Sequence, residues 1–206
     1  MKDVLLILTG YVLGSLPWGY WLPRLLRGVD IRTVGSRSTG AANVWRTLGF
    51  KIALGVALLD IGKGFAAAFL GNWLGGELVG VLAGVAALVG HWRPLFIGFR
   101  RGGKIVATTG GVALALMPLA TLAAGVVWVC LFLATRYTSV ASMVAAATLP
   151  LFAVAFGASE PVIAFAAGAA VAIFVLHRAN IARLLTRSEN RFELRRASKA
   201  PPAPDT

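Results

Sequence analysis

The stretch VATTGGVALALMPLATLAAGVVWVCLFLA, residues 106–134, decides how the chain is folded. Its 29 mostly apolar residues exceed the ~20 that one membrane-spanning helix needs. Pro118 stands near the middle, and proline ends or kinks a helix because it lacks a backbone N–H. The stretch is therefore either two short helices that turn near Pro118 or one kinked helix, and the choice sets the number of membrane crossings.

Other apolar spans flank this stretch, at about 3–23, 52–71, 77–98, 138–157 and 160–177. Of the twenty Lys and Arg residues, eighteen fall in the polar segments Arg24–Lys51, Arg93–Lys104, Arg136 and Arg178–Lys199. Cationic loops stay on the cytoplasmic side of a membrane, and only two helices within 106–134 place all these cations on that side. We therefore predict an all-α membrane protein, a compact bundle of seven transmembrane helices, some of them short, with the N-terminus outside and the C-terminus cytoplasmic.

The composition is that of a polytopic membrane protein. Hydrophobic residues make up 58% of the 206 residues and the mean hydropathy is +0.78, values that exclude an ordinary soluble globule. Cytoplasmic loops explain the net charge of +12, and the sequence has no basic helix, aromatic-interleaved patch or zinc motif typical of nucleic-acid binding. Residues 1–192 are predicted to form one integral-membrane domain and residues 193–206 a polar, disordered cytoplasmic tail.

The first polar segment, residues 34–46, has the composition of an anion-binding loop. Gly35, Ser36 and Asn43 stand there among further Ser, Thr and Gly residues. Glycines allow tight turns that expose backbone N–H groups, and the hydroxyl and amide side chains add donors. Arg46 follows three residues after Asn43 and shares its face if a helix begins there. The segment is either a phosphate-binding loop or an ordinary cytoplasmic loop with a capping side chain.

The second polar segment, residues 90–104, ends in Gly102-Gly103-Lys104 directly before an apolar helix. A glycine pair and a lysine at a helix N-terminus can bind an anion through backbone amides and a point charge. The spacing differs from that of a Walker loop, so nucleotide binding does not follow. His91, near the start of this segment, is one of two histidines in the chain.

The third polar segment, residues 176–192, begins where the last span reaches the cytoplasm. Its His177 and Asn180 are three residues apart and share a helix face. His177 and His91 both lie at cytoplasmic helix ends, where a histidine is either an interfacial hydrogen-bonding residue or part of a site. The sequence predicts that these two histidines lie close to the anion-binding loops.

Inside the spans, Asp60 and Lys63 are three residues apart and are expected to form an ion pair, because buried charges need partners. Ser142, in the first turn of a later helix, either caps that helix or faces a site. The sequence shows no metal-ligand cluster, no paired carboxylates and no Gly-x-Ser-x-Gly motif, and Phe96 replaces the Asp of a His-x-x-x-x-Asp acyltransferase dyad. Any catalysis would therefore rely on positioning and cationic stabilisation.

These segments resemble the acyl-phosphate:glycerol-3-phosphate acyltransferase family (PlsY type), which consists of bacterial integral membrane enzymes. The resemblance covers about residues 10–192. The fragments that carry it are, in chain order, Gly14-Ser15-Leu16-Pro17-x-Gly19, Val34-Gly35-Ser36 with Gly40-Ala41-x-Asn43-x-x-Arg46, Asp60-x-x-Lys63-Gly64, Gly90-His91-x-x-Pro94-x-Phe96, Gly102-Gly103-Lys104-x-Val106-Ala107-Thr108, and His177-x-x-Asn180-Ile181-x-Arg183-Leu184-Leu185 with Glu189-x-Arg191-Phe192.

The chain departs from the family pattern beside the anion-binding loops. Arg37 and Ser38 stand where the family has Gly and Asn, Ala42 stands where it has Thr, and Ile105 stands where Gly is expected. The sequence leaves two alternatives: the added arginines compensate electrostatically for the lost glycines, or the loop geometry, the rate and the acyl-donor choice are altered, as in a divergent paralogue.

The resemblance implies an enzyme that transfers a fatty acyl group from acyl phosphate to the 1-position of glycerol 3-phosphate. The products would be lysophosphatidic acid and phosphate, in the first step of phospholipid synthesis. It implies a multi-pass protein of the bacterial inner (plasma) membrane, surrounded by lipids, with a cytoplasmic active site and without cofactor, metal or nucleic acid. The alternatives are an anion (phosphate) transporter or channel and a catalytically divergent paralogue.

The resemblance also implies site residues, with Lys104, His177 and Ser36 expected to be catalytic. The residues expected to contact substrate are Gly35, Ser36, Asn43, Arg46, His91, Gly102, Gly103, Lys104, Ser142, His177 and Asn180. Ser36, Asn43 and the Gly102 and Gly103 amides are expected to hold the acyl phosphate, with Lys104 neutralising its charge. The residues expected to bind and orient glycerol 3-phosphate are Arg46, Lys104, Ser142, His177 and Asn180. The acceptor of the hydroxyl proton is either a phosphate oxygen of the donor or His177.

Overall fold

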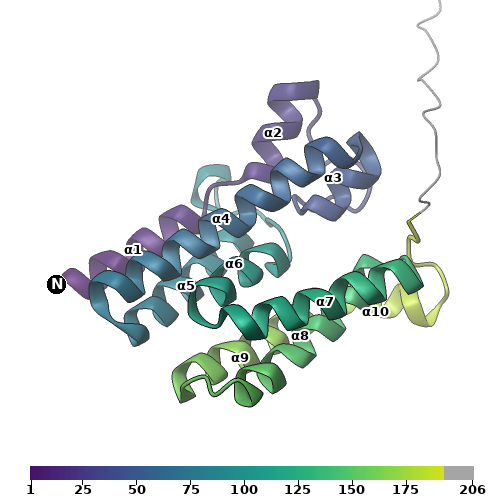
Figure 1. Cartoon of the computed structure of the whole chain (residues 1–206). Coiled ribbons are helices and arrows are strands. Elements are labelled where there is room, and N and C mark those ends of the chain that lie inside the picture. Colours follow the sequence, from purple (N-terminus) through teal and green to yellow (C-terminus); the bar gives the residue numbers. More distant parts are fainter. Residues whose placement is uncertain (193–206) are drawn as a thin grey trace, which may run out of the picture.

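The computed structural model describes residues 1–192, and every regular element in that range is a helix. The predicted disorder of residues 193–206 lies outside the described residues. The helices are α1 (Lys2–Gly14), α2 (Trp18–Arg27), α3 (Ala41–Leu48), α4 (Phe50–Gly75), α5 (Glu77–Trp92), the 3-10 helix η1 (Leu95–Ile97), α6 (Val106–Leu116), α7 (Pro118–Thr135), α8 (Thr138–Ala155), α9 (Glu160–Leu176) and α10 (Arg178–Leu185) (Figure 1).

The predicted division of residues 106–134 is confirmed, because α6 and α7 are separate helices. Met117 leaves the helical conformation with φ −146° and ψ 66°, and Pro118 is the first residue of α7. Proline is well placed there, since the first N–H groups of a helix have no intrahelical acceptor in any case. The two helices have 11 and 18 residues, so only α6 is too short to span a bilayer upright.

The prediction of a multi-pass membrane protein is also confirmed. Among residues 1–192, five segments are long and apolar enough to cross a membrane: Lys2–Arg27, Phe50–Gly75, Glu77–Ile97, Pro118–Thr135 and Thr138–Ala155. Helix α9 passes the same test together with α10, from which it is bent by 56°, and α6 is a shorter apolar helix. The count of seven crossings and the orientation of the termini stay predictions.

The helices form two groups, with α1, α4 and α5 in one and α7, α8 and α9 in the other, and α6 packs between them (Figure 1). Close approach within the first group, and of α6 to that group, requires glycine. A Cβ on Gly14 would lie 2.1 Å from the carbonyl oxygen of Ala87, and one on Gly111 would lie 1.9 Å from that of Ile61. These positions bring α1 against α5 and α6 against α4 at backbone contact distance.

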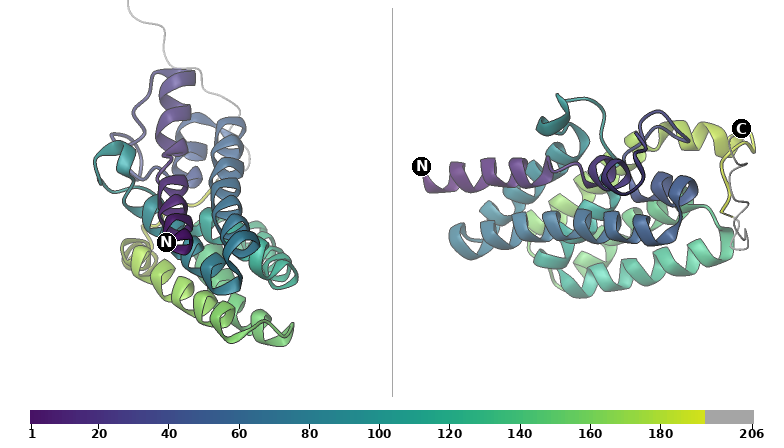
Figure 2. Two further views of the ribbon diagram at one scale, coloured as in Figure 1. Left: turned by 90° about the vertical axis from the view of Figure 1, so that its left-hand side faces the viewer. Right: turned by 90° about the horizontal axis from the view of Figure 1, so that it is seen from above.

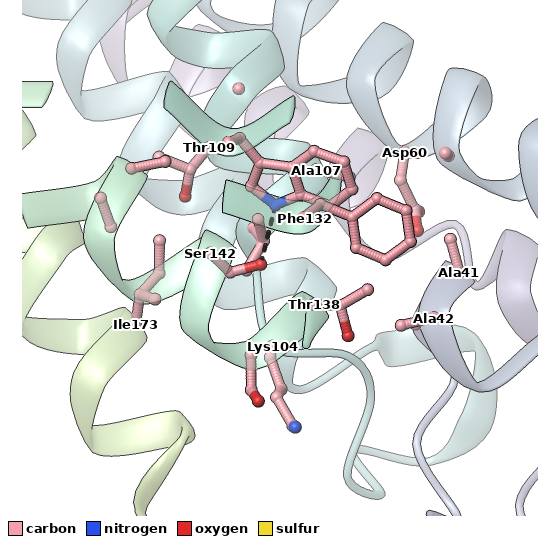
Figure 3. Close-up of a pocket in the computed structure, with 18 of the residues that line it drawn as sticks. Ala41, Ala42, Asp60, Lys104, Ala107, Thr109, Phe132, Thr138, Ser142 and Ile173 are labelled. Atoms are coloured by element: carbon pink, nitrogen blue, oxygen red, sulfur yellow. Dashed lines mark hydrogen bonds between the residues drawn. The ribbon is translucent and has the colours of Figure 1, made fainter. Parts of the chain in front are cut away.

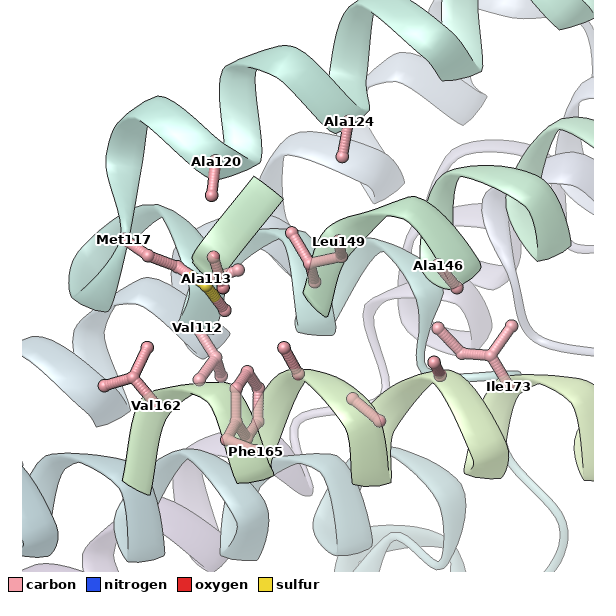
Figure 4. Close-up of a cluster of buried hydrophobic side chains, with 14 of the residues drawn as sticks. Val112, Ala113, Met117, Ala120, Ala124, Ala146, Leu149, Val162, Phe165 and Ile173 are labelled. Carbon is pink, nitrogen blue, oxygen red and sulfur yellow. The ribbon is translucent and has the colours of Figure 1, made fainter. Parts of the chain in front are cut away.

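The largest buried apolar cluster joins α6 to the second group (Figure 4). Val112, Ala113 and Met117 meet Leu149 from α8 and Phe165 from α9, together with other small side chains. At one end of the bundle, α3 and α10 lie close to the polar loops, and the N-terminus lies at the opposite end (Figure 2). The fold therefore gathers the three polar segments at one end of the helices, as the sequence predicted.

Candidate active site

A cavity of about 610 Å³ opens at the end of the bundle where the polar segments meet. Its walls come from the α-helices α3 to α10, and the helices of the two groups face each other across it (Figure 3). Charged and polar side chains occupy one end, and alanine, glycine and larger apolar residues line the rest. The cavity thus joins a polar site to an apolar groove between membrane-spanning helices.

Lys104 stands at the centre of the polar end, directly before α6. Its Nζ donates a 2.5 Å hydrogen bond to Asn180 Oδ1 on α10. Burial lowers the pKa of Lys104 to about 8, the positive charges of Arg183, Arg46 and Arg101 act in the same direction, and Glu189 opposes them. The lysine is therefore poised to gain an anionic ligand, which would restore a more ordinary pKa.

Glu189 organises this end of the cavity, although the sequence analysis assigned it no role. Its Oε1 accepts hydrogen bonds from Asn180 Nδ2 at 2.6 Å and from Ser139 Oγ at 2.9 Å. Its Oε2 accepts one from Arg183 Nε at 2.7 Å. Because Nδ2 of Asn180 donates to Glu189, Oδ1 of Asn180 is turned toward Lys104. The Glu-x-Arg-Phe fragment, which holds a carboxylate within a strongly cationic segment, was the available sequence signal.

His177 lines the cavity between α9 and α10 and is buried. Its Nδ1 lies 2.8 Å from the carbonyl oxygen of Ile173, which can only accept, so Nδ1 carries the proton. Burial and the nearby charge of Lys104 lower the pKa of His177 to about 4. At neutral pH the ring is uncharged, and its Nε2 lone pair is available as a hydrogen-bond acceptor.

Ser142 also lines the cavity, from the first turns of α8. Its Oγ accepts a 3.1 Å hydrogen bond from Trp128 Nε1 on α7 (Figure 3). Because the oxygen already accepts from the indole, the hydroxyl hydrogen is the part of Ser142 that can bind a ligand oxygen.

The first loop is organised by Asn43, which is 1% exposed. Its Oδ1 accepts from the backbone N–H of Ser36 at 2.9 Å, and its Nδ2 donates to the carbonyl oxygens of Ile31, Val34 and Ser38 at 3.0–3.2 Å. All of these contacts lie within the loop. Asn43 therefore shapes the turn that presents Ser36 to the cavity, and its contact with the donor phosphate stays a prediction.

Gly35 belongs to the same turn. Its φ is +57°, and a Cβ there would lie 2.3 Å from Asn43 Oδ1. Glycine is needed for this close approach.

The backbone amides of the glycine pair before Lys104 also make hydrogen bonds within the protein. The backbone N–H of Gly102 donates to the carbonyl oxygen of Trp92 at 2.9 Å, and that of Gly103 donates to the carbonyl oxygen of His91 at 3.3 Å. These amides are thus occupied by the end of α5. A Cβ on Gly103 would lie 2.0 Å from His91 Nε2, so the glycine lets the loop pass over the imidazole.

His91 contacts the buried ion pair between Asp60 and Lys63 that the sequence predicted. Asp60 Oδ1 lies 2.8 Å from Lys63 Nζ and 3.4 Å from His91 Nδ1. Lys63 Nζ also donates to the carbonyl oxygen of Leu16 at 2.8 Å, at the break between α1 and α2. The pair therefore ties three helices together, and His91 connects it to the loop that carries Lys104.

Arg46 projects from α3 into the polar end of the cavity. Its guanidinium carbon lies 5.1 Å from the centre of the Phe192 ring, which packs 4.7 Å from Trp45 and 5.6 Å from Phe132 on α7. Burial lowers the pKa of Arg46, and the guanidinium remains charged at neutral pH. The aromatic cluster fixes α3 against α7 beside the cavity mouth.

The two lost family glycines occupy backbone conformations that suit glycine. Arg37 has φ +56° and Ile105, the N-cap residue of α6, has φ +59°. A β-branched residue in the left-handed region is strained by about 1–3 kcal/mol. The chain thus keeps the loop geometry that glycine favours, with strain at two positions beside the site.

Thr109 is a second residue that the sequence analysis did not single out. It lines the cavity from α6, is 3% exposed, and its Oγ1 has no hydrogen-bond partner among residues 1–192 (Figure 3). A buried hydroxyl without a partner is costly unless a ligand satisfies it. Within the same described range, no three His, Cys, Asp or Glu side chains lie close enough together to hold a metal ion.

The geometry can be compared with known proteins. The family model described as glycerol-3-phosphate acyltransferase matches residues 4–187. A glycerol-3-phosphate acyltransferase of Synechococcus sp. (strain JA-3-3Ab) is 45% identical over 191 residues, covering 93% of this chain and 94% of the relative. That of Desulforudis audaxviator (strain MP104C) is 42% identical over 193 residues, covering 94% and 97%.

Two crystal structures of PlsY (YgiH), an integral membrane glycerol 3-phosphate acyltransferase, are similar in fold. The glycerol 3-phosphate form gives a TM-score of 0.89 at 39% identity, and the lysophosphatidic acid form gives 0.87 at 38%. Each comparison covers 94% of this chain and 96% of the other. The chain is therefore a multi-pass membrane protein that belongs to the glycerol-3-phosphate acyltransferase family.

Proposed function

We propose that the protein transfers a fatty acyl group from acyl phosphate to the 1-hydroxyl of glycerol 3-phosphate, at the cytoplasmic face of a bacterial inner (plasma) membrane. The observation that carries the proposal is the cavity, in which cationic and hydrogen-bonding groups adjoin an apolar groove between membrane helices. Such a site suits a reaction between a water-soluble phosphoester and a lipid-chain donor.

The polar end supplies the positive charge that two phosphorylated substrates require. Lys104 and Arg46 reach it from separate segments, and the first N–H groups of α6 begin beside Lys104. We assign the hydroxyl of Ser36, Lys104, Arg46 and the first N–H groups of α6 to the donor phosphate. In this assignment Asn43, Gly102 and Gly103 shape the loops and leave phosphate contact to their neighbours.

Glycerol 3-phosphate is assigned to the side of the cavity formed by α8, α9 and α10. Ser142 can donate to a substrate oxygen, and the Nε2 of His177 can accept from a glycerol hydroxyl. Asn180 is held by Glu189 and positions Lys104 between the two substrates. These contacts would hold the 1-hydroxyl against the acyl carbon.

In the reaction the 1-hydroxyl oxygen forms a bond to the acyl carbon, and the bond from that carbon to the phosphate oxygen breaks. Inorganic phosphate leaves with the electron pair, and lysophosphatidic acid is the other product. A histidine with a pKa of about 4 is a weak base at neutral pH. We therefore assign the hydroxyl proton to a phosphate oxygen of the donor, while His177 orients the hydroxyl.

The test is turnover of detergent-purified protein with palmitoyl phosphate and glycerol 3-phosphate, and with palmitoyl-coenzyme A as the competing donor. Lysophosphatidic acid formed only from palmitoyl phosphate supports the proposal. Phosphate release without lysophosphatidic acid would show that the protein hydrolyses acyl phosphate and does not transfer the acyl group. Lys104→Ala and His177→Ala should each lower turnover by about 10²-fold or more, and Lys51→Ala, at an exposed cation on α4, should not.

Sidedness needs its own experiment. In a Cys130→Ser background, Arg136→Cys places a single thiol at the exposed end of α7, and Arg178→Cys places one at the exposed first residue of α10. A membrane-impermeant maleimide should label both from the cytoplasmic side. Labelling of the two positions from opposite sides would contradict a single polar face.

A further inference from the structure

The apolar part of the cavity has a defined length along α7. Its lining residues there are Thr121, Ala124, Gly125, Trp128, Val129 and Phe132, which recur every three or four positions and so form one helix face. From Phe132 to Thr121 the helix rises by about 16.5 Å. This length is close to the ~15 Å of hydrocarbon in one leaflet of a bilayer. Leu149 on α8 lines the cavity 11 residues beyond Thr138, at a similar depth.

Two glycines face this groove without serving helix packing. Gly125 on α7 and Gly110 on α6 both line the cavity, and a Cβ built on either one meets no atom within 4 Å. The neighbouring Gly111 is different, because its Cβ would lie 1.9 Å from the carbonyl oxygen of Ile61. Gly111 therefore allows α6 to pack on α4, whereas the missing side chains of Gly110 and Gly125 leave the groove open.

We infer that Gly110 and Gly125 set the longest acyl chain that the groove admits. The inference rests on the proposed function, in which this groove holds the chain of the acyl donor. Gly125 lies seven residues from Phe132, about 10.5 Å along α7, and Gly110 lies four residues from the start of α6, about 6 Å along that helix. A larger side chain at Gly125 would occupy the path of a long chain and leave a short one room, whereas one at Gly110, nearer the polar end, would obstruct both.

The decisive variant is Gly125→Leu, assayed with octanoyl and palmitoyl phosphate and compared with wild type. The ratio of kcat/KM for palmitoyl phosphate to that for octanoyl phosphate is expected to fall by about tenfold or more, because a leucine in the groove excludes the distal methylenes. Gly110→Leu, nearer the polar end, is expected to lower kcat/KM for both donors.

The matched control is Gly168→Leu. Gly168 lies on α9, its added Cβ also meets no atom within 4 Å, and it lines a separate apolar cavity between α5 and α9. The same substitution there should leave the ratio for the two donors unchanged. A general effect of one added leucine on a membrane helix would appear in both variants, whereas an effect on chain length belongs to Gly125 alone.

Binding of non-reactive alkyl phosphates separates this inference from the proposed function. Hexadecyl phosphate should raise the Tm of wild type more than octyl phosphate does, and Gly125→Leu should abolish that difference. Folded Gly125→Leu protein with an unchanged donor ratio or an unchanged difference in Tm overturns the inference. If wild type binds hexadecyl phosphate but forms no lysophosphatidic acid, the proposed function is overturned. The inference about the groove is then decided by the alkyl phosphate binding data alone.

Discussion

Lys104 Nζ and Asn180 Oδ1 lie 2.5 Å apart, and this hydrogen bond joins the loop before α6 to the helix after the last span. The contact depends in turn on Glu189, which binds the amide nitrogen of the same asparagine at 2.6 Å. A cation that is to bind phosphate is thus held by a neutral oxygen. The positive charge of Lys104 stays available for a ligand, while Glu189 fixes the position of Lys104 through Asn180.

The protonation of Lys104 gives a prediction about pH. Since burial lowers its pKa to about 8, kcat/KM should fall as pH rises through 8, when the free enzyme loses the phosphate-binding charge. Stability should change in the opposite direction. Between about pH 8 and the ordinary value of 10.5 the unfolded chain binds more protons than the folded one, so the free energy of unfolding increases with pH.

Both trends are measured on the same protein, by turnover and by thermal unfolding across pH 7–10. Lys104→Met serves as the control, because without the amine both dependences should flatten. A wild-type activity that stays constant up to pH 10 would show that the lysine keeps an ordinary pKa.

Glu189→Gln should lower kcat/KM by about tenfold or more through a higher KM for glycerol 3-phosphate. The variant loses the charge that accepts hydrogen bonds from Asn180, Ser139 and Arg183, and a hydrogen bond to a charged group contributes about 1.5–3 kcal/mol. Steady-state kinetics with each substrate varied in turn provide the measurement. Glu77→Gln is the control, since that carboxylate binds Ser159 in the exposed connection between other helices. Equal kinetics in the two variants would remove Glu189 from the site.

Arg37→Gly should stabilise the protein by about 1 kcal/mol, because Arg37 is exposed and its φ of +56° is strained for any residue with a Cβ. Arg37→Ala should change little, since alanine keeps the Cβ. The comparison of the two by thermal unfolding isolates the backbone effect from the loss of charge. Equal Tm values for glycine and alanine would contradict the strain.

Ile105→Gly is expected to behave differently. The same relief of strain is available at φ +59°, but the isoleucine side chain is 3% exposed and its removal from the core costs about 2–5 kcal/mol. The variant should therefore be less stable than wild type, and the loop before α6 more mobile. Thermal unfolding gives the sign, and a Tm above that of wild type would show that strain outweighs packing.

Asp60→Asn should destabilise the protein by about 3–5 kcal/mol, because it leaves Lys63 as a buried cation without its carboxylate. The double variant Asp60→Leu/Lys63→Met removes both charges and should recover much of that loss. Thermal unfolding of both variants supplies the comparison. A double variant less stable than Asp60→Asn would mean that the pair contributes more than charge compensation.

Thr109→Val tests the buried hydroxyl that faces the cavity. The exchange removes the unpartnered Oγ1 and keeps the shape of the side chain, so the unliganded protein should be as stable as wild type or more so. If substrate satisfies that hydroxyl, KM for the acyl donor should rise about fivefold or more. Unchanged kinetics together with higher stability would assign Thr109 to neither substrate.

Several features followed from the sequence because they depend on neighbours along the chain. Pro118 lacks an N–H, so a helix was expected to end or kink near it, and α7 begins there. Asp60 and Lys63 are one helical turn apart, so two buried charges had to pair. The alternation of apolar spans with cationic loops predicted that the polar segments gather at one end of a helical membrane bundle.

The use of individual polar groups was decided only by tertiary structure. Asn43 and the amides of Gly102 and Gly103 look available in the sequence, yet folding gives them to carbonyls of their own loop and of α5. Glu189 looks like an ordinary carboxylate in a cationic tail, yet it holds residues from α8 and α10 together. The physical reason is that a buried donor or acceptor must find a partner, and segments far apart in the chain determine which partner is near.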